Sequence, residues 1–182
     1  TNNTNGQPPG GGGAPDGNSY AGGGKANDGN SGIPAPTWQG NMDSKGWSAT
    51  GGGGGGGSYA NPPNASGGSG GPGIVCIRYE IGQKQTGAGA KATGGAISYY
   101  NSKTIHTFLN PGTFATGPTW SPTASVEYVV VAGGGSGGSI GGGGGGAGGY
   151  ITNNTTIPGP SSFAITVGQG GMVSSQLNWD SP

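Results

Sequence analysis

The sequence predicts an all-β fold combined with glycine-rich extended helices of the polyglycine-II type, with essentially no α-helix. Gly and Pro contribute 49 and 14 of the 182 residues, about a third of the chain and more than ordinary globular domains contain. Leu, Ile, Val and Phe together number only 22, too few to fill the core of a helical bundle or a doubly wound α/β enzyme. These apolar residues gather in short runs that alternate as strands do, and no run has the 3.6-residue period of a helix.

The first of these runs predicts a strand over 74–81. Val75, Ile77, Tyr79 and Ile81 alternate with mostly polar residues, so we expect them to share the face of the strand that points into a core. Further strands are predicted at 96–100, 104–109, 126–132 and 162–167. The turn 101–103 predicts a hairpin, because its asparagine tolerates positive φ, and a second turn is predicted at 110–113.

Three groups of glycine tracts accompany the strands. They are 10–13 with a looser extension to 32, then 51–57 together with 67–73, and then 133–149. One interpretation is that they are flexible linkers, which a Gly/Ser composition favours. The tracts recur three times, however, and two of them run directly into or out of a predicted strand, as if the chain continued without a hinge.

The alternative interpretation is that the glycine tracts pack against one another. Glycine adopts the extended threefold helix of polyproline II, and the lack of a Cβ lets such helices approach closely. Ordering each residue costs on the order of 1–2 kcal/mol, which side-chain burial cannot offset in a run of glycines. Only backbone hydrogen bonds shared among several helices can do so, and we therefore expect an ordered lattice of main chains.

The charge balance excludes several classes of partner. Six Lys and Arg balance six Asp and Glu, so the chain has no basic patch for nucleic acid, and no nucleic-acid partner is expected. No apolar run is long enough to insert into a membrane. Cys76 is the single cysteine, which excludes an internal disulfide framework. The chain starts at Thr1 without a Met or a leader, and we expect it to be a segment of something longer.

Catalytic chemistry is not expected, and neither are a cofactor or a metal site. His106 and Cys76 both lie in predicted strands, where His106 facing solvent or a neighbour and Cys76 as a buried structural thiol are the ordinary interpretations. A carboxylate pair for glycoside hydrolysis would have to come from Asp16, Asp28, Asp43, Glu80, Glu127 and Asp180. Four of these lie in glycine-rich or terminal loops without a rigid frame, and no Cys/His spacing suits zinc.

Aromatic residues outside the strands are the remaining candidates for a site. Flat aromatic faces in loops suit the apolar faces of sugars, and Trp is enriched where binding energy concentrates. The candidate contacts with a receptor or glycan are Trp38, Trp47, Tyr59 and Trp120. The competing interpretation is that each tryptophan covers the edge of a glycine layer or of a strand.

Four motifs resemble a known glycine-rich domain. They are the GAGAKATGGAISYYNSKTIHTF stretch at 87–108, EYVVVAGGG at 127–135 with the glycine run to 150, FAITVG at 163–168, and GGSGGPGIVCIRY at 67–79. Together they resemble the glycine-rich repeat domain of bacteriophage virion and tail-fibre proteins, especially those of marine and cyanobacterial phages. A more distant likeness is to the polyglycine-II adhesin tip of T-even-like long tail fibres.

The order of the motifs differs from that of the family, because the closing strand precedes the opening hairpin. We therefore predict that 1–81 is the C-terminal part of one repeat, 82–95 a joiner and 96–182 the N-terminal part of the next. The resemblance implies a structural repeat of an extracellular fibre, a phage tail or virion fibre involved in host attachment. Its partners would be neighbouring repeats or copies of itself, and a bacterial surface glycan or protein. The alternative is a non-viral secreted glycine-rich filament or adhesin.

Overall fold

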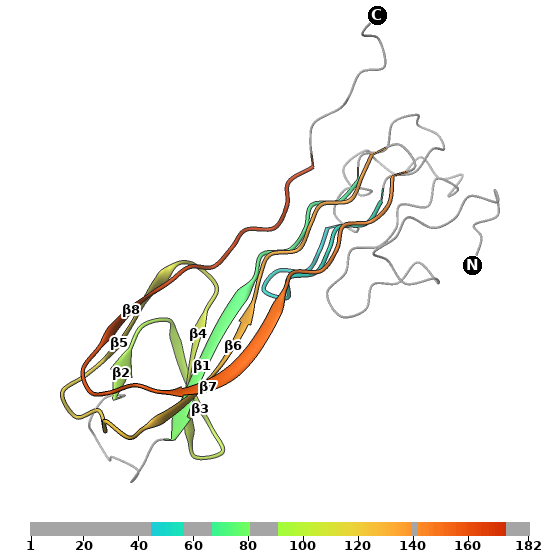
Figure 1. The fold of residues 1–182 in the computed structure, drawn as a ribbon. Helices are drawn as coiled ribbons and strands as arrows, with labels where there is room; N and C mark the ends of the chain where they lie inside the picture. The colour runs from blue at the N-terminus through green and yellow to red at the C-terminus, as the bar shows by residue number, and fades with distance from the viewer. Residues whose placement is uncertain (1–44, 57–66, 81–90, 140–141, 174–182) are drawn as a thin grey trace, which may run out of the picture. The chain divides into compact units, whose positions relative to one another are not determined.

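The computed structural model describes residues 45–56, 67–80, 91–139 and 142–173 (Figure 1). These residues form eight strands and no helix, which confirms the predicted all-β class. The chain divides into two compact units. The glycine unit lies within Thr1–Gly73, Ala132–Gly149 and Gly168–Pro182, and the sheet unit comprises Ile74–Val131 and Tyr150–Val167. The predicted repeat boundaries at 81/82 and 95/96 stay a prediction.

The sheet unit contains two antiparallel sheets. The larger has the strand order β3-β4-β1-β6-β7, with β1 at Ile74–Glu80, β3 at Ala96–Tyr100, β4 at Lys103–Phe108, β6 at Ser125–Val131 and β7 at Tyr150–Thr156. The smaller has the order β2-β5-β8, with β2 at Ala92–Thr93, β5 at Gly112–Thr116 and β8 at Ser162–Ile165.

The alternation predicted for the first strand is present. Val75, Ile77 and Tyr79 of β1 are buried, whereas Ile81 lies outside the described residues. The neighbouring β4 buries Thr104, His106 and Phe108 by the same alternation. Each of these three lies opposite one of the buried β1 residues, so one face of the large sheet is buried along both strands.

The predicted hairpin joins β3 and β4. Asn101 and Ser102 occupy its turn, and their φ angles of 47° and 59° are those of a two-residue turn that follows the twist of the strands. The predicted second turn separates β4 from β5. Strands β2, β5 and β7 are not predicted from the sequence, since β2 is two residues long and β7 reads YITNNTT without apolar alternation.

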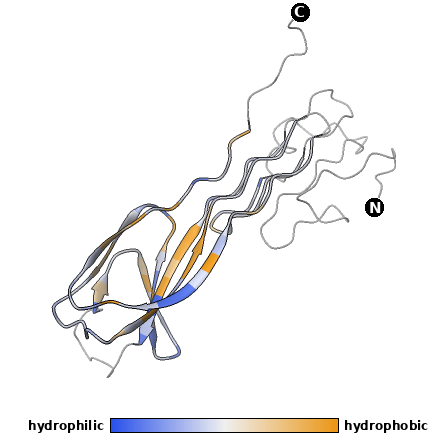
Figure 2. Ribbon diagram, in the orientation of Figure 1, coloured by the Kyte–Doolittle hydropathy of each residue, from blue (hydrophilic) through white to orange (hydrophobic). Residues whose placement is uncertain are grey.

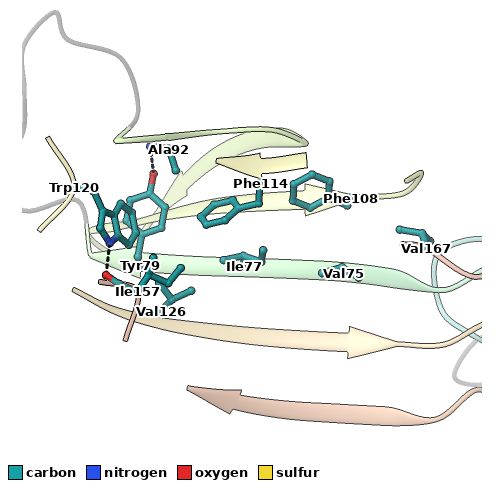
Figure 3. Close-up of a cluster of buried hydrophobic side chains, with 10 residues drawn as sticks. All are labelled: Val75, Ile77, Tyr79, Ala92, Phe108, Phe114, Trp120, Val126, Ile157 and Val167. Carbon is teal, nitrogen blue, oxygen red and sulfur yellow. Dashed lines mark hydrogen bonds between the residues drawn. The ribbon is translucent and has the colours of Figure 1, made fainter. Parts of the chain in front are cut away.

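A small aromatic core holds the sheet unit together (Figure 3). Tyr79 of β1 meets Trp120 edge to face with ring centroids 4.7 Å apart, and Phe114 of β5 meets the ring of His106 at 5.1 Å. The other buried apolar members are Val75, Ile77, Ala92, Phe108, Val126, Ile157 and Val167. Figure 2 shows the hydrophobic residues concentrated on β1 and β6, while the glycine segments are nearly neutral in colour.

In the described part of the chain, no helix has the length and apolar character needed to cross a membrane.

Candidate functional site

The glycine unit is built from five segments without strand hydrogen-bond ladders. We call them segment I (51–56), segment II (67–73), segment III (132–139), segment IV (142–149) and segment V (168–173). Figure 1 shows the first four as wavy traces that run side by side. Their backbone amides and carbonyls bond from one segment to the next, so the described parts of the second and third glycine tracts are ordered against each other.

Segment I bonds to its neighbours at intervals of three residues. Segment II donates to it from Gly68 to Gly55 O at 2.7 Å and from Gly71 to Gly52 O at 2.8 Å. Segment IV donates to it from Gly145 to Gly54 O and from Gly148 to Gly51 O, both at 2.8 Å. In each pair, three residues forward along one segment correspond to three residues backward along the other. Segments II and IV are therefore antiparallel to segment I.

Segment III alternates between two neighbours with the same interval. It bonds to segment IV through Ala132 N to Gly149 O at 2.9 Å, Gly135 N to Gly146 O at 2.8 Å and Gly138 N to Gly143 O at 2.8 Å. It bonds to segment II through Gly134 N to Gly71 O and Gly137 N to Gly68 O, both at 2.9 Å. Burial follows the same interval, because Gly134 and Gly137 are buried whereas 132, 135 and 138 are exposed.

Segment V joins the same array. It accepts hydrogen bonds from segment II, from Gly73 N to Gly168 O at 3.0 Å and from Gly70 N to Gly171 O at 2.9 Å. Gly171 in turn donates to Gly134 O of segment III at 2.7 Å. Segment I, whose six glycines are all buried, bonds to segments II, III and IV. Main chain therefore surrounds main chain, and no side chain is needed to hold the array.

The spacing of the segments requires glycine at particular positions. A Cβ on Gly145 would lie 2.1 Å from Gly135 O, and one on Gly148 would lie 1.9 Å from Ala132 O. Both distances are far below any real contact, and the obstructing atoms belong to the backbone. The next residues along, Gly146 and Gly149, have nothing within 4 Å of such a Cβ. Segment IV thus has a closed face and an open face, repeating every three residues.

A sequence signal for this interval exists and was not used in the prediction. The residues that interrupt the glycine segments are spaced three apart, as in Ser69 and Pro72 of segment II, Ser136 and Ser139 of segment III, and Gln169 and Met172 of segment V. Within 67–73, 133–139 and 168–172, side chains are therefore confined to one of every three positions, and only Ala132 and Val173 at the segment ends depart from this spacing. This spacing could have separated a packed lattice from a random linker.

The aromatic candidates have different environments. Trp47 belongs to the glycine unit, where its side chain is 58% exposed beside a turn closed by the Thr50 hydroxyl donating to Trp47 O at 2.8 Å. Trp120 is only 4% exposed, and its indole N–H donates to Ile157 O at 3.0 Å. Trp120 therefore packs in the core. Trp38 and Tyr59 lie outside the described residues.

His106 has a fully satisfied neutral ring. Its Nδ1 lies 2.7 Å from Gly94 O, which only accepts, so Nδ1 carries the proton. Its Nε2 lies 3.2 Å from the Tyr79 hydroxyl, which donates to it while accepting from Ala92 N–H at 3.2 Å. Burial lowers the pKa of His106 below its usual 6.5, and burial raises the pKa of Tyr79. This arrangement fastens β4 to the segment 92–94 and has no open side for a substrate.

The outward face of the large sheet carries Cys76 and an ion cluster. Cys76 is only partly buried, since it points away from the side of β1 that enters the core. Arg78 Nε donates to Glu127 Oε2 at 2.7 Å, and Lys103 bonds the other carboxylate oxygen, so the pKa of Glu127 is lowered. Among the described residues no group of three His, Cys, Asp or Glu side chains is placed to hold a metal ion.

Comparison with known families found one match, over less than half of the chain. Residues 107–181 match the family model of a glycine-rich domain, a stretch that begins within β4 and includes segments III to V. Searches of the curated proteins and of the solved structures found no match. The match supports the glycine-rich part of the predicted resemblance, and a phage origin stays a prediction.

Proposed function

We propose that this chain is a structural unit of an extracellular fibre, in which the glycine segments pack as polyglycine-II-type helices. Three residues complete one turn of such a helix, so residues three apart face the same neighbour. Segment III follows this rule: 132, 135 and 138 bond to segment IV, whereas 134 and 137 bond to segment II. A β-strand would instead present every second residue to a neighbour. The three-residue exchange of partners is the observation that carries the proposal.

The backbone conformation is consistent with this interpretation. The polyproline-II helix has φ near −75° at every residue. Among the described glycines of the five segments, Gly51 alone has a positive φ, 64°, and it lies at the end of segment I next to a turn. The other described glycines avoid the positive-φ region although glycine enters it without steric cost. A flexible glycine linker would enter both halves of φ space, so the restriction to one half favours regular extended segments.

A fibre role agrees with how the unit is held together. Each peptide unit in the array contributes the same donor and acceptor, so the array can be extended by adding segments without any particular side chain. The net charge of zero leaves no strong field to repel neighbouring copies. The partners we propose are neighbouring repeats or further copies of the chain, whose many weak contacts gain strength through multivalency.

Within fibres, we propose a phage tail or virion fibre that contacts a bacterial surface. The motifs of the chain resemble those of phage fibre repeats, and the match of residues 107–181 to a glycine-rich domain is compatible with that resemblance. Trp47 is the described aromatic candidate with an exposed ring, in a turn at the start of the glycine array. It is the residue we would test first for contact with a surface glycan or protein.

The glycine packing is tested by two neighbouring substitutions in the 182-residue chain, Gly145→Ala and Gly146→Ala. The methyl group meets the Gly135 carbonyl in the first variant and open space in the second. We expect Gly145→Ala to speed hydrogen exchange at the amides of segments III and IV by about tenfold or more, and Gly146→Ala to change it less than about twofold. Equal tolerance of both substitutions would show that the segments do not pack in this way.

The fibre role is tested on the same proteins by negative-stain electron microscopy at rising concentration. Filaments should form from the wild-type chain and from Gly146→Ala, and should be lost or shortened in Gly145→Ala. If the exchange data show the packing and the wild-type chain still forms no filaments, the fibre role is wrong while the packing stands.

A further inference from the structure

Among the residues that the structure describes, strand β7 is an unprotected edge of the large sheet. It pairs with β6 on one side and is the last strand in the order β3-β4-β1-β6-β7. All seven of its residues are exposed, and the sequence YITNNTT contains no charge and no proline. Natural proteins usually protect such edges with lysine, proline, bulges or very short strands, because an open edge pairs with other chains. β7 has none of these devices.

The backbone groups that face outward from β7 can be identified. Opposed residues of an antiparallel pair exchange hydrogen bonds at every second position. Ala132 N bonds Gly149 O at 2.9 Å, and these two residues continue the register in which Val131 lies opposite Tyr150. Since every second pair is bonded, Ile151 and the other odd-numbered residues of β7 bond to β6. In agreement, Asn154 N–H donates to the side-chain oxygen of Asn153 at 2.8 Å instead of to β6. The backbone groups of residues 150, 152, 154 and 156 therefore face outward.

We propose that β7 pairs antiparallel with β7 of a second copy of this chain, centred on Asn153. Tyr150 would then lie opposite Thr156, Ile151 opposite Thr155 and Thr152 opposite Asn154. Even-numbered residues oppose even-numbered ones, so the outward N–H and C=O groups of the two edges meet, and Asn154 N–H exchanges its bond to the Asn153 side chain for one to the partner strand. The side chains also stay on matching faces, and the two five-stranded sheets become one continuous sheet.

The self-complementarity of β7 is the reason to choose a second copy as the partner. The pairing sets an aromatic ring or a β-branched side chain against Thr at both ends, combinations that stabilise antiparallel pairs. No like charges meet, because β7 has no charged residue. The other edge, β3, is shorter, five residues against seven, and offers fewer backbone groups.

The contact is small, and it deepens the proposed fibre function on which it rests. A strand of seven residues is about 23 Å long, at about 3.3 Å per residue. Pairing along this length alone buries less than the roughly 1,200 Å² of a standard stable interface. We therefore expect weak dimers in dilute solution and firm contacts where many copies are held together in a fibre.

The first test is a disulfide at the centre of the pair. Asn153→Cys is introduced with Cys76→Ser, so that the new thiol is the only one. Opposed residues at a non-hydrogen-bonded position have Cα atoms about 4.5 Å apart, which lies within disulfide range. Oxidised glutathione should convert the full chain to covalent dimers. Ser98→Cys in the same background, at the middle of the β3 edge, is the matched control and should stay monomeric under the same conditions.

The second test removes an outward N–H without touching the β6 ladder. Thr152→Pro deletes one edge donor, at a position where proline is tolerated because its nitrogen faces away from the sheet. Thr152→Val keeps the N–H and is the control for the lost hydroxyl. Sedimentation should show association weakened about tenfold by proline and little changed by valine, with circular dichroism confirming that both fold.

The two proposals fail in different ways. If Asn153→Cys remains monomeric, or if Ser98→Cys cross-links as readily, pairing through β7 is wrong even where filaments form. If Asn153→Cys dimerises and the wild-type chain forms no filaments, pairing through β7 stands and the fibre role is wrong.

Discussion

His106 is a single buried residue that we expect to make the sheet unit sensitive to acid. Its ring contacts the Tyr79 hydroxyl and the Gly94 carbonyl, and it lies edge to face with the Phe114 ring. None of these groups carries a charge. Both nitrogens of the neutral ring are already hydrogen-bonded, and neither bonds to a carboxylate. A second proton would therefore place an uncompensated charge in the core. Burial is accordingly the larger influence on its pKa and lowers it, while the bond to Gly94 acts in the opposite direction.

We predict that the sheet unit loses stability as the pH falls below about 6.5, the usual pKa of histidine. The folded pKa of His106 is depressed, so the unfolded chain takes up the proton first and gains stability relative to the folded chain as the pH falls toward the folded value. Above pH 6.5 this contribution is constant. Thermal unfolding between pH 5 and pH 8 measures it, in steps of about half a pH unit.

The variant His106→Gln isolates the effect. It should cost about 1–3 kcal/mol at pH 7.5, because it disturbs buried hydrogen bonds, and it should flatten the dependence of the melting temperature on pH between 5 and 7. Glu127 does not interfere in this range, since its pKa lies below 4.5 and its contribution is lost only in stronger acid. A melting temperature that falls as steeply in the variant as in the wild type would assign the acid sensitivity to other groups.

Among the elements, the turn between β3 and β4 carries a removable strain. Ser102 adopts φ 59°, in the left-handed region where a side chain costs about 1–2 kcal/mol, whereas Asn101 at φ 47° is better suited to it. Asn-Gly is the favoured sequence for such a two-residue turn. We predict that Ser102→Gly stabilises the hairpin by about 1 kcal/mol and that Asn101→Ala destabilises it. Urea unfolding of the two variants provides the measurement, and a loss of stability in Ser102→Gly would contradict the turn assignment.

Strands with an apolar stripe could be predicted from the sequence, and strands without one could not. β1 was predictable because Val75, Ile77 and Tyr79 alternate, and the β3–β4 hairpin because a turn sequence separates two strand-like runs. β7 is exposed along its whole length, and its sequence has no alternation of apolar and polar residues that would predict a strand. Trp120 was ambiguous for a related reason: a tryptophan near Pro and Ser has the same local sequence whether it enters a core or faces solvent.

The glycine segments were predictable as ordered main chain but not in their pairing, because a run of identical residues carries no register. The structure shows where the register comes from. Ile74 pairs with Val131, and at steps of three along the same two stretches Gly71 bonds Gly134 and Gly68 bonds Gly137. Side chains that select one pairing of β1 with β6 thereby select one pairing of the glycines that adjoin them in the chain.

At the scale of the whole molecule, two kinds of cohesion coexist in one chain. The sheet unit depends on a side-chain core that contains Tyr79, Phe114 and Trp120, and the glycine unit depends on hydrogen bonds between peptide groups. Neither the core cluster nor the glycine hydrogen bonds involve a charged side chain, and the six positive and six negative side chains of the full sequence cancel. The five glycine segments and β7 contain no charged residue, so we expect an assembly through them to form by neutral contacts.

We therefore predict that self-association of the full chain is nearly independent of salt. Between about 50 and 500 mM NaCl the screening length falls severalfold, which strongly weakens assembly through exposed charges but leaves backbone pairing largely unchanged. Light scattering or sedimentation at fixed concentration should show a change of less than about twofold over this range.

The matched comparison is a chain carrying Thr152→Lys and Asn154→Lys, whose positive charges would oppose each other across the β7 pair. Its association should be weaker than that of the wild type at low salt and recover in part as salt is added. A steep salt dependence in the wild-type chain itself would mean that ionic contacts, and not neutral edges and glycine backbones, drive its assembly.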